Sequence, residues 1–108
     1  MEALGLRSCN PCESGTPALS PESTARLLAE VQGWAIRDGE LVRDFRFENY
    51  NQTTAFVHAA AGIARREDHH PDITFGYKTC SIRYLTHSIG GLSENDFICA
   101  AKINALLD

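Results

Sequence analysis

The sequence predicts an α+β fold, in which an antiparallel four-stranded sheet has its helices packed on one face. Two stretches, residues 34–47 and 72–87, alternate apolar and polar side chains around a turn, which is the pattern of a β-hairpin. Three others, near residues 20–33, 50–67 and 93–107, place apolar residues at helical spacing. The expected order is α-β-β-α-β-β-α, and a chain of 108 residues suits one such domain.

Residues 1–18 are expected to form a flexible leader before a folded domain at residues 19–108. The leader contains Pro, Gly and Ser without helical or strand periodicity. It also holds Cys9 and Cys12 in a Cys-Asn-Pro-Cys segment. Because a structural zinc site usually needs four ligands and no second Cys pair follows, we interpret these two residues as reduced thiols.

The first helix has a start signal and a stop signal. Ser20 can cap it, Pro21 suits its first position, and Gly33 can end it. The hairpin that follows is expected to turn at Asp38-Gly39, because an Asp-Gly pair between two alternating runs favours a tight turn.

The central helix is expected at residues 50–67. Alanine-rich apolar positions give it a slim face that can lie close to a sheet: Phe56, Ala59, Ala60, Ile63 and Ala64. His58 is expected at its surface or at the boundary of its apolar face. Because Pro71 cannot continue a helix and disfavours helical geometry at His70, both His69 and His70 should lie where the helix ends.

The second hairpin is expected to turn near Lys78-Thr79. The last helix should begin at Ser93, which has the spacing of a capping box with Asp96. In such a box the carboxylate of the later residue accepts the N–H of the cap.

Charge and hydropathy exclude several classes of partner. The net charge is −4 and there is no run of Lys or Arg, so a nucleic-acid partner is not expected. No apolar run is long enough to span a membrane, and the chain start lacks a signal-peptide pattern, so we expect a cytoplasmic protein. Open strand edges in so small a domain favour association with further copies of the chain.

Three of the four histidines, His69, His70 and His87, fall within residues 67–87. An antiparallel hairpin brings its first and last residues side by side, and the expected turn lies midway between residues 70 and 87. We therefore expect the three imidazoles to meet at one end of the sheet, with Asp72 nearby.

The residues alone leave three uses of this cluster open. Imidazole exchanges protons near neutral pH, which suits general acid–base catalysis. The second use is a metal hydrolase with His69, His87 and Asp72 as ligands. His69 and His70 cannot easily bind the same ion, because adjacent residues of an extended segment point in opposite directions. The third is a group of surface histidines at a strand end.

The complete pattern resembles the pterin-4a-carbinolamine dehydratases from about Leu19 to Leu106. Its elements are His69-His70-Pro71, Tyr77, Thr86-His87, Gly90-Gly91-Leu92 and Asp96, preceded by Gly33-Trp34 and Phe45-Arg46-Phe47. Because many matches occur in order and at consistent spacing, the resemblance is specific, whereas His-His-Pro alone would not be.

The resemblance implies a hydro-lyase without metal or organic cofactor. Its substrate would be 4a-hydroxytetrahydropterin, left after aromatic amino acid hydroxylation, and its product the quinonoid dihydropterin. His69 and His87 would be the proton-transfer pair, in either order, and His70 would hold or orient the pterin. The expected substrate-binding residues are Pro71, Asp72, Thr86 and Asp96, although the capping box alone accounts for Asp96.

The same resemblance implies dimers or tetramers, and animal members also serve as dimerisation cofactors of a homeodomain transcription factor.

Two positions depart from the family pattern. Arg65 stands where many members carry an acidic residue, a role that Glu67 or Asp68 could take, and Ile73 stands where Trp is common. The alternative function is therefore a catalytically weak, dimerising binding or regulatory protein of the same fold.

Overall fold

The computed structural model describes residues 3–12 and 15–107; the remaining positions of the expected leader and domain lie outside the described residues. The predicted α-β-β-α-β-β-α order is confirmed, with two short 3-10 helices added. In chain order the elements are η1 (Leu4–Leu6), α1 (Pro21–Leu28), β1 (Ala35–Arg37), β2 (Glu40–Arg46), α2 (Tyr50–Glu67), β3 (Asp72–Phe75), β4 (Thr79–Tyr84), η2 (His87–Ile89) and α3 (Glu94–Ala105).

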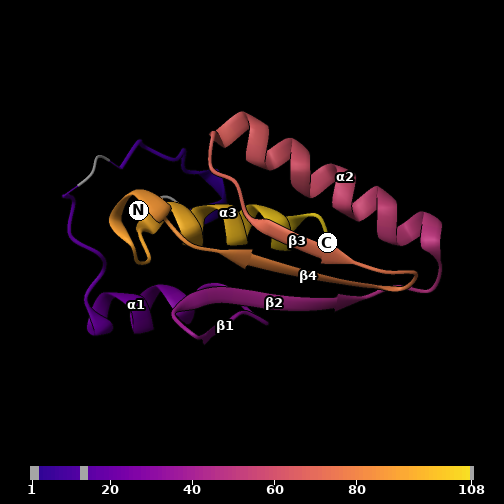
Figure 1. The fold of residues 1–108 in the computed structure, drawn as a ribbon, viewed down its shortest axis with the longest axis horizontal. Coiled ribbons are helices and arrows are strands. Elements are labelled where there is room, and N and C mark those ends of the chain that lie inside the picture. Colours follow the sequence, from indigo (N-terminus) through magenta and orange to yellow (C-terminus); the bar gives the residue numbers. More distant parts are fainter. Residues whose placement is uncertain (1–2, 13–14, 108) are drawn as a thin grey trace.

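The four strands form one antiparallel sheet in the order β1-β2-β4-β3, which leaves β1 and β3 at the edges. Helices α2 and α3 pack against each other, and α2 also contacts β3 and β4 (Figure 1). Leu41 of β2 and both Ile82 and Tyr84 of β4 are fully buried. Each such side chain contributes roughly 1.5–3 kcal/mol by leaving water.

Most helix boundaries follow the local signals, but α1 ends at Leu28 and not at the expected Gly33. Ser20 caps α1 by accepting the Ser23 N–H at 3.1 Å. Asn49 caps α2 in the same way, accepting the Gln52 N–H at 2.8 Å, and His58 on α2 is exposed as expected. Among the described helices, none combines the length and apolarity needed to cross a bilayer.

The turn of the second hairpin lies one residue earlier than expected. Phe75 pairs with Cys80, and the Gly76 N–H donates to the Thr79 carbonyl at 2.9 Å. The central residues of the turn are therefore Tyr77 and Lys78 rather than Lys78 and Thr79. This moves the pairing by two residues, a shift that leaves every side chain on its own face, so alternation alone could not exclude it.

The leader packs on α3. Leu4 is buried, and the ammonium group of Lys102 donates to the Gly5 carbonyl at 2.9 Å. This contact helps to explain why α3 is buried on more than one side, with Cys99 and Ala100 among its buried residues. The domain boundary at residue 18 stays a prediction.

The open edge strands of the sheet favour association of the protein with further copies of itself. On the β3 hairpin Phe75 and Tyr77 are exposed, and the open edge can add a strand from another copy. We expect light scattering at micromolar concentration to return a dimer or tetramer mass. Phe75→Lys should raise the monomer fraction, whereas His58→Lys on α2 should not. A monomer mass for the wild type would contradict the prediction.

Candidate active site

The end of α2 sets the directions of the first two histidines. Asp68 ends the helix in a left-handed conformation (φ 51°, ψ 44°), and the N–H groups of Asp68 and His69 both donate to the Ala64 carbonyl. A left-handed residue other than glycine costs about 1 kcal/mol, and such residues are frequent at functional sites. The turn leaves His69 half-buried against the core, while His70 is exposed.

The imidazole of His69 is held on two sides. Its Nε2 lies 2.6 Å from Oδ1 of Asp96, and its ring stacks on Tyr84 with 5.7 Å between ring centroids and 3° between planes. The side chain of His69 is 12% exposed and that of Asp96 is fully buried. One edge of the ring is therefore fixed in the core and the other remains accessible.

Asp96 serves as cap and as histidine partner at once. Its Oδ2 accepts the Thr86 hydroxyl at 2.8 Å and the Ser93 N–H at 2.9 Å, while Oδ1 faces His69. Two donors already occupy Oδ2, so Oδ1 is the oxygen of Asp96 that accepts from His69. Because a carboxylate only accepts, Nε2 of His69 carries the proton, and in the neutral ring Nδ1 is left as the acceptor.

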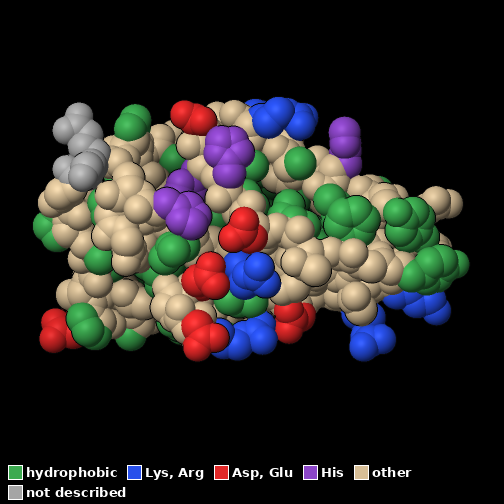
Figure 2. All heavy atoms as spheres, viewed as in Figure 1, with side chains coloured by type: hydrophobic (Ala, Val, Ile, Leu, Met, Phe, Trp, Pro, Cys, Tyr) green, Lys and Arg blue, Asp and Glu red, His purple; other side chains and the backbone are tan. Residues whose placement is uncertain are grey.

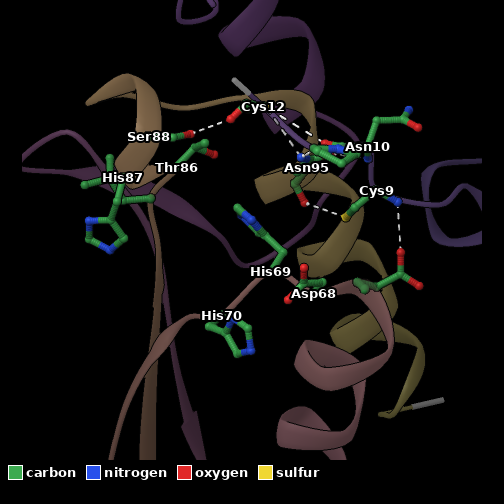
Figure 3. A pocket seen from close by; sticks show the side chains of 13 residues that line it. Cys9, Asn10, Cys12, Asp68, His69, His70, Thr86, His87, Ser88 and Asn95 are labelled. Atoms are coloured by element: carbon green, nitrogen blue, oxygen red, sulfur yellow. Dashed lines mark hydrogen bonds between the residues drawn. The ribbon is translucent and has the colours of Figure 1, made fainter. Parts of the chain in front are cut away.

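All three histidines line one pocket of about 440 Å³. His69 and His70 come from the loop between α2 and β3, and His87 is the first residue of η2 (Figure 3). Figure 2 shows histidine side chains gathered on the surface where α2 meets the end of the sheet, with a further one over α2. Among the described residues, only His69 of the three forms a side-chain hydrogen bond.

The pairing of β3 with β4 is not what brings the three histidines together. Strand β3 begins at Asp72 and β4 ends at Tyr84, so neither His70 nor His87 belongs to the ladder. With the observed register, an extension of the ladder would place His70 opposite Leu85 rather than His87. The turn at η2 brings His87 to the pocket instead.

The expected substrate-binding residues divide into two groups. Thr86 lines the pocket, whereas Pro71 and Asp72 do not. Asp72 is instead exposed and pairs with Arg83 in the β3–β4 ladder. Asp96 also does not line the pocket. Since it is fully buried, it acts on the pocket through His69 and not by direct contact.

The acidic partner of the first histidine is Asp96 and not a residue near the end of α2. Arg65 is exposed and lies outside the pocket lining. Glu67 and Asp68 do line the pocket, but Oε1 of Glu67 accepts the Cys9 N–H at 2.8 Å. The departure at Arg65 therefore leaves the His69–carboxylate pair intact.

Sequence reasoning missed one side of the pocket. Residues 9–12 of the leader line it, together with Ser88 and Asn95. The only signal was the Cys-Asn-Pro-Cys segment, and neither its spacing nor its composition indicates a partner 85 residues away in the chain.

The cysteines near the pocket are thiols within the described part of the chain. Cys9 and Cys99 lie 3.6 Å apart between sulfur atoms. The hydrogen bond with Cys9 and burial together raise the pKa of Cys99, and burial raises the pKa of Tyr84, so both stay protonated at neutral pH. Among the described residues, no three His, Cys, Asp or Glu side chains are grouped so that they could hold a metal ion.

Comparison with known sequences gives a consistent result. Residues 17–106 match the model of the family described as pterin 4 alpha carbinolamine dehydratase. A protein of Nitrosospira multiformis, provisionally named pterin-4-alpha-carbinolamine dehydratase, is 52% identical over 98% of this chain and 94% of its own length. One of Nitrosomonas europaea with the same name is 54% identical over 93% of this chain and 89% of its own length.

Two solved structures share the fold. A transcriptional coactivator/pterin dehydratase from Brucella melitensis is 29% identical, with a TM-score of 0.81 over 84% of this chain and 99% of that chain. A pterin dehydratase-like protein described as a RuBisCO assembly factor in the alpha-carboxysome is 30% identical, with a TM-score of 0.58 over 68% of this chain and 84% of that chain. On the family match and these relatives, the chain belongs to the pterin 4 alpha carbinolamine dehydratase family.

Proposed function

We propose that this protein is a hydro-lyase that removes water from 4a-hydroxytetrahydropterin and releases the quinonoid dihydropterin. The observation that carries the proposal is the buried carboxylate of Asp96 on Nε2 of His69, in a pocket that His70 and His87 share. A carboxylate that fixes one imidazole nitrogen directs the other toward a ligand, which is the arrangement that proton transfer requires.

The reaction needs one acid and one base. The C4a hydroxyl receives a proton and leaves as water, N5 loses its proton, and a double bond forms between C4a and N5. The proton given and the proton taken balance, so no redox partner enters. His69 and His87 form the transferring pair in this proposal, and His70, exposed at the pocket edge, holds the pterin.

The direct test is the rate of dehydration of chemically generated 4a-hydroxytetrahydropterin, followed by absorbance of the quinonoid product. We expect clear acceleration over the uncatalysed reaction, and the same rate after treatment with a chelator and removal of metal. A wild-type protein that gives only the uncatalysed rate would overturn the proposal. Loss of the rate on chelation would favour the metal hydrolase alternative.

The second candidate is a catalytically weak, dimerising binding protein of the same fold. It is favoured by the two similar structures, one described as a transcriptional coactivator/pterin dehydratase and the other as a RuBisCO assembly factor. The assay separates the two candidates, because the second predicts a stable oligomer whose rate stays at background.

A further inference from the structure

We propose that residues 9–12, the leader wall, form the substrate-positioning side of the pterin pocket, and that Asn95 is the positioning residue that docks them. The inference rests on the proposed function, because it takes a pterin as the ligand. It adds a role for a segment outside the motifs that carry the family resemblance. Figure 3 shows Asn10 and Cys12 beside Asn95, on the side of His69 away from His70 in that view.

Asn95 holds the leader wall by its backbone. Its side-chain oxygen accepts the Asn10 N–H at 3.0 Å, and its side-chain nitrogen donates to the Asn10 carbonyl. The Asn95 side chain thus pairs with both backbone groups of one residue, and Asn95 is only 7% exposed. Such a double contact fixes position and orientation together, which a single hydrogen bond cannot do.

The leader wall is anchored to the same elements that supply the histidine site. The Ser88 hydroxyl of η2, next to His87, donates to the Cys12 carbonyl at 2.8 Å. At the end of α2, Glu67 accepts the Cys9 N–H at 2.8 Å. On α3 the anchor Asn95 directly precedes Asp96, so adjacent residues hold the leader wall and His69. The geometry of the wall is therefore set relative to the proton-transferring groups.

The chemistry of the wall suits a flat, uncharged heterocycle. Asn10 contributes an exposed carboxamide, and Cys12 a thiol whose sulfur lies 3.5 Å from the Asn95 amide nitrogen. No side chain among residues 9–12 carries a formal charge at neutral pH when the thiols are protonated. A pterin has several donors and acceptors at its edge, so polar groups here can orient it while the histidines transfer protons.

The test uses two replacements of Asn95 in the full chain. Asn95→Ala removes both hydrogen bonds to Asn10. Asn95→Asp keeps an acceptor for the Asn10 N–H but replaces the donor by a carboxylate that repels the Asn10 carbonyl. A carboxylate in the first turn of α3 favours the helix, but this residue is 7% exposed and stands next to the buried Asp96 carboxylate, which costs stability. Thermal melts of both variants are therefore measured alongside the kinetics, so that docking is separated from stability.

We expect both variants to raise KM about tenfold while kcat stays within about twofold. The leader wall is expected to bind the substrate and its transition state equally well, so weakening it changes KM and not kcat. Hydrogen exchange at the backbone amides of Cys9 and Asn10 should accelerate in both variants. Binding of 7,8-dihydropterin, a stable probe, should weaken in parallel. As a matched control, Asn104→Ala on the same helix removes the side-chain contact with Trp34 and should leave KM unchanged.

Two results would overturn the inference while leaving the proposed function in place: wild-type KM and probe affinity in both Asn95 variants, or unprotected amides of Cys9 and Asn10 in the wild type. A fall in kcat at constant KM would also count against it. An inactive wild type would instead remove the proposed function. In that case probe binding still decides whether the leader wall positions a pterin.

Discussion

Asp96→Asn is expected to lower the rate of dehydration by about 10²- to 10⁴-fold, the usual contribution of a correctly oriented acid or base. The buried carboxylate accepts from His69, Thr86 and Ser93. An asparagine amide turned toward His69 would donate to Nε2 instead of accepting from it. The ring would then change tautomer, and Nδ1 would present a proton to the pocket where the wild type presents a lone pair.

The same change should cost stability, because the hydrogen bonds to a charged acceptor become bonds to a neutral one. We expect a loss of about 1–3 kcal/mol in the free energy of unfolding. Thermal melts and kcat should therefore be measured on the same samples. The matched control is Asp44→Asn, a change at an exposed carboxylate on β2, which should leave the rate unchanged. A wild-type rate and pH profile for Asp96→Asn would remove the His69–Asp96 pair from the mechanism.

His87→Ala should have the second large effect, a loss of about 10²- to 10⁴-fold in kcat with little change in folding. His87 is exposed and begins η2, so its truncation opens no core cavity. The expected loss of stability is within about 1 kcal/mol. Steady-state kinetics with melting curves test both halves of the expectation.

Added imidazole should restore part of the activity of His87→Ala if the missing group transfers a proton. His58→Ala is the suitable control, because it removes an exposed histidine on α2 that does not line the pocket. A His87→Ala protein that dehydrates at the wild-type rate would exclude His87 from proton transfer. The proposed pair would then need another member from the pocket lining.

Local signals predicted the helices well. The bounds of α2 agree with expectation at both ends, because the alanine-rich stripe begins after a capping residue and Pro71 stops the helix. The start of α3 at Ser93 agrees for the same reason. These features depend on neighbours in the sequence, so the sequence contains enough information to place them.

The site was less predictable where distant segments meet. The capping box explained Asp96 completely, so nothing in the sequence required its second oxygen to face His69. The hairpin register was ambiguous by two residues, since Ile73 and Phe75 keep their face after such a shift. The leader wall contacts Asn95 across most of the chain, and no periodicity reports such a contact.

The pairing of Asn10 with Asn95 has a consequence for the order of assembly. During synthesis the leader emerges first and α3 last among the described elements, and the two are 85 residues apart. Domains generally fold as units, and α3 contributes core residues such as Phe97 and Ile103, which are fully buried. The pocket is completed only after α3 has left the ribosome, when it docks on the sheet and the leader closes over it. A nascent chain without α3 should therefore bind no pterin, although the residues of all the other helices and strands have already been synthesised.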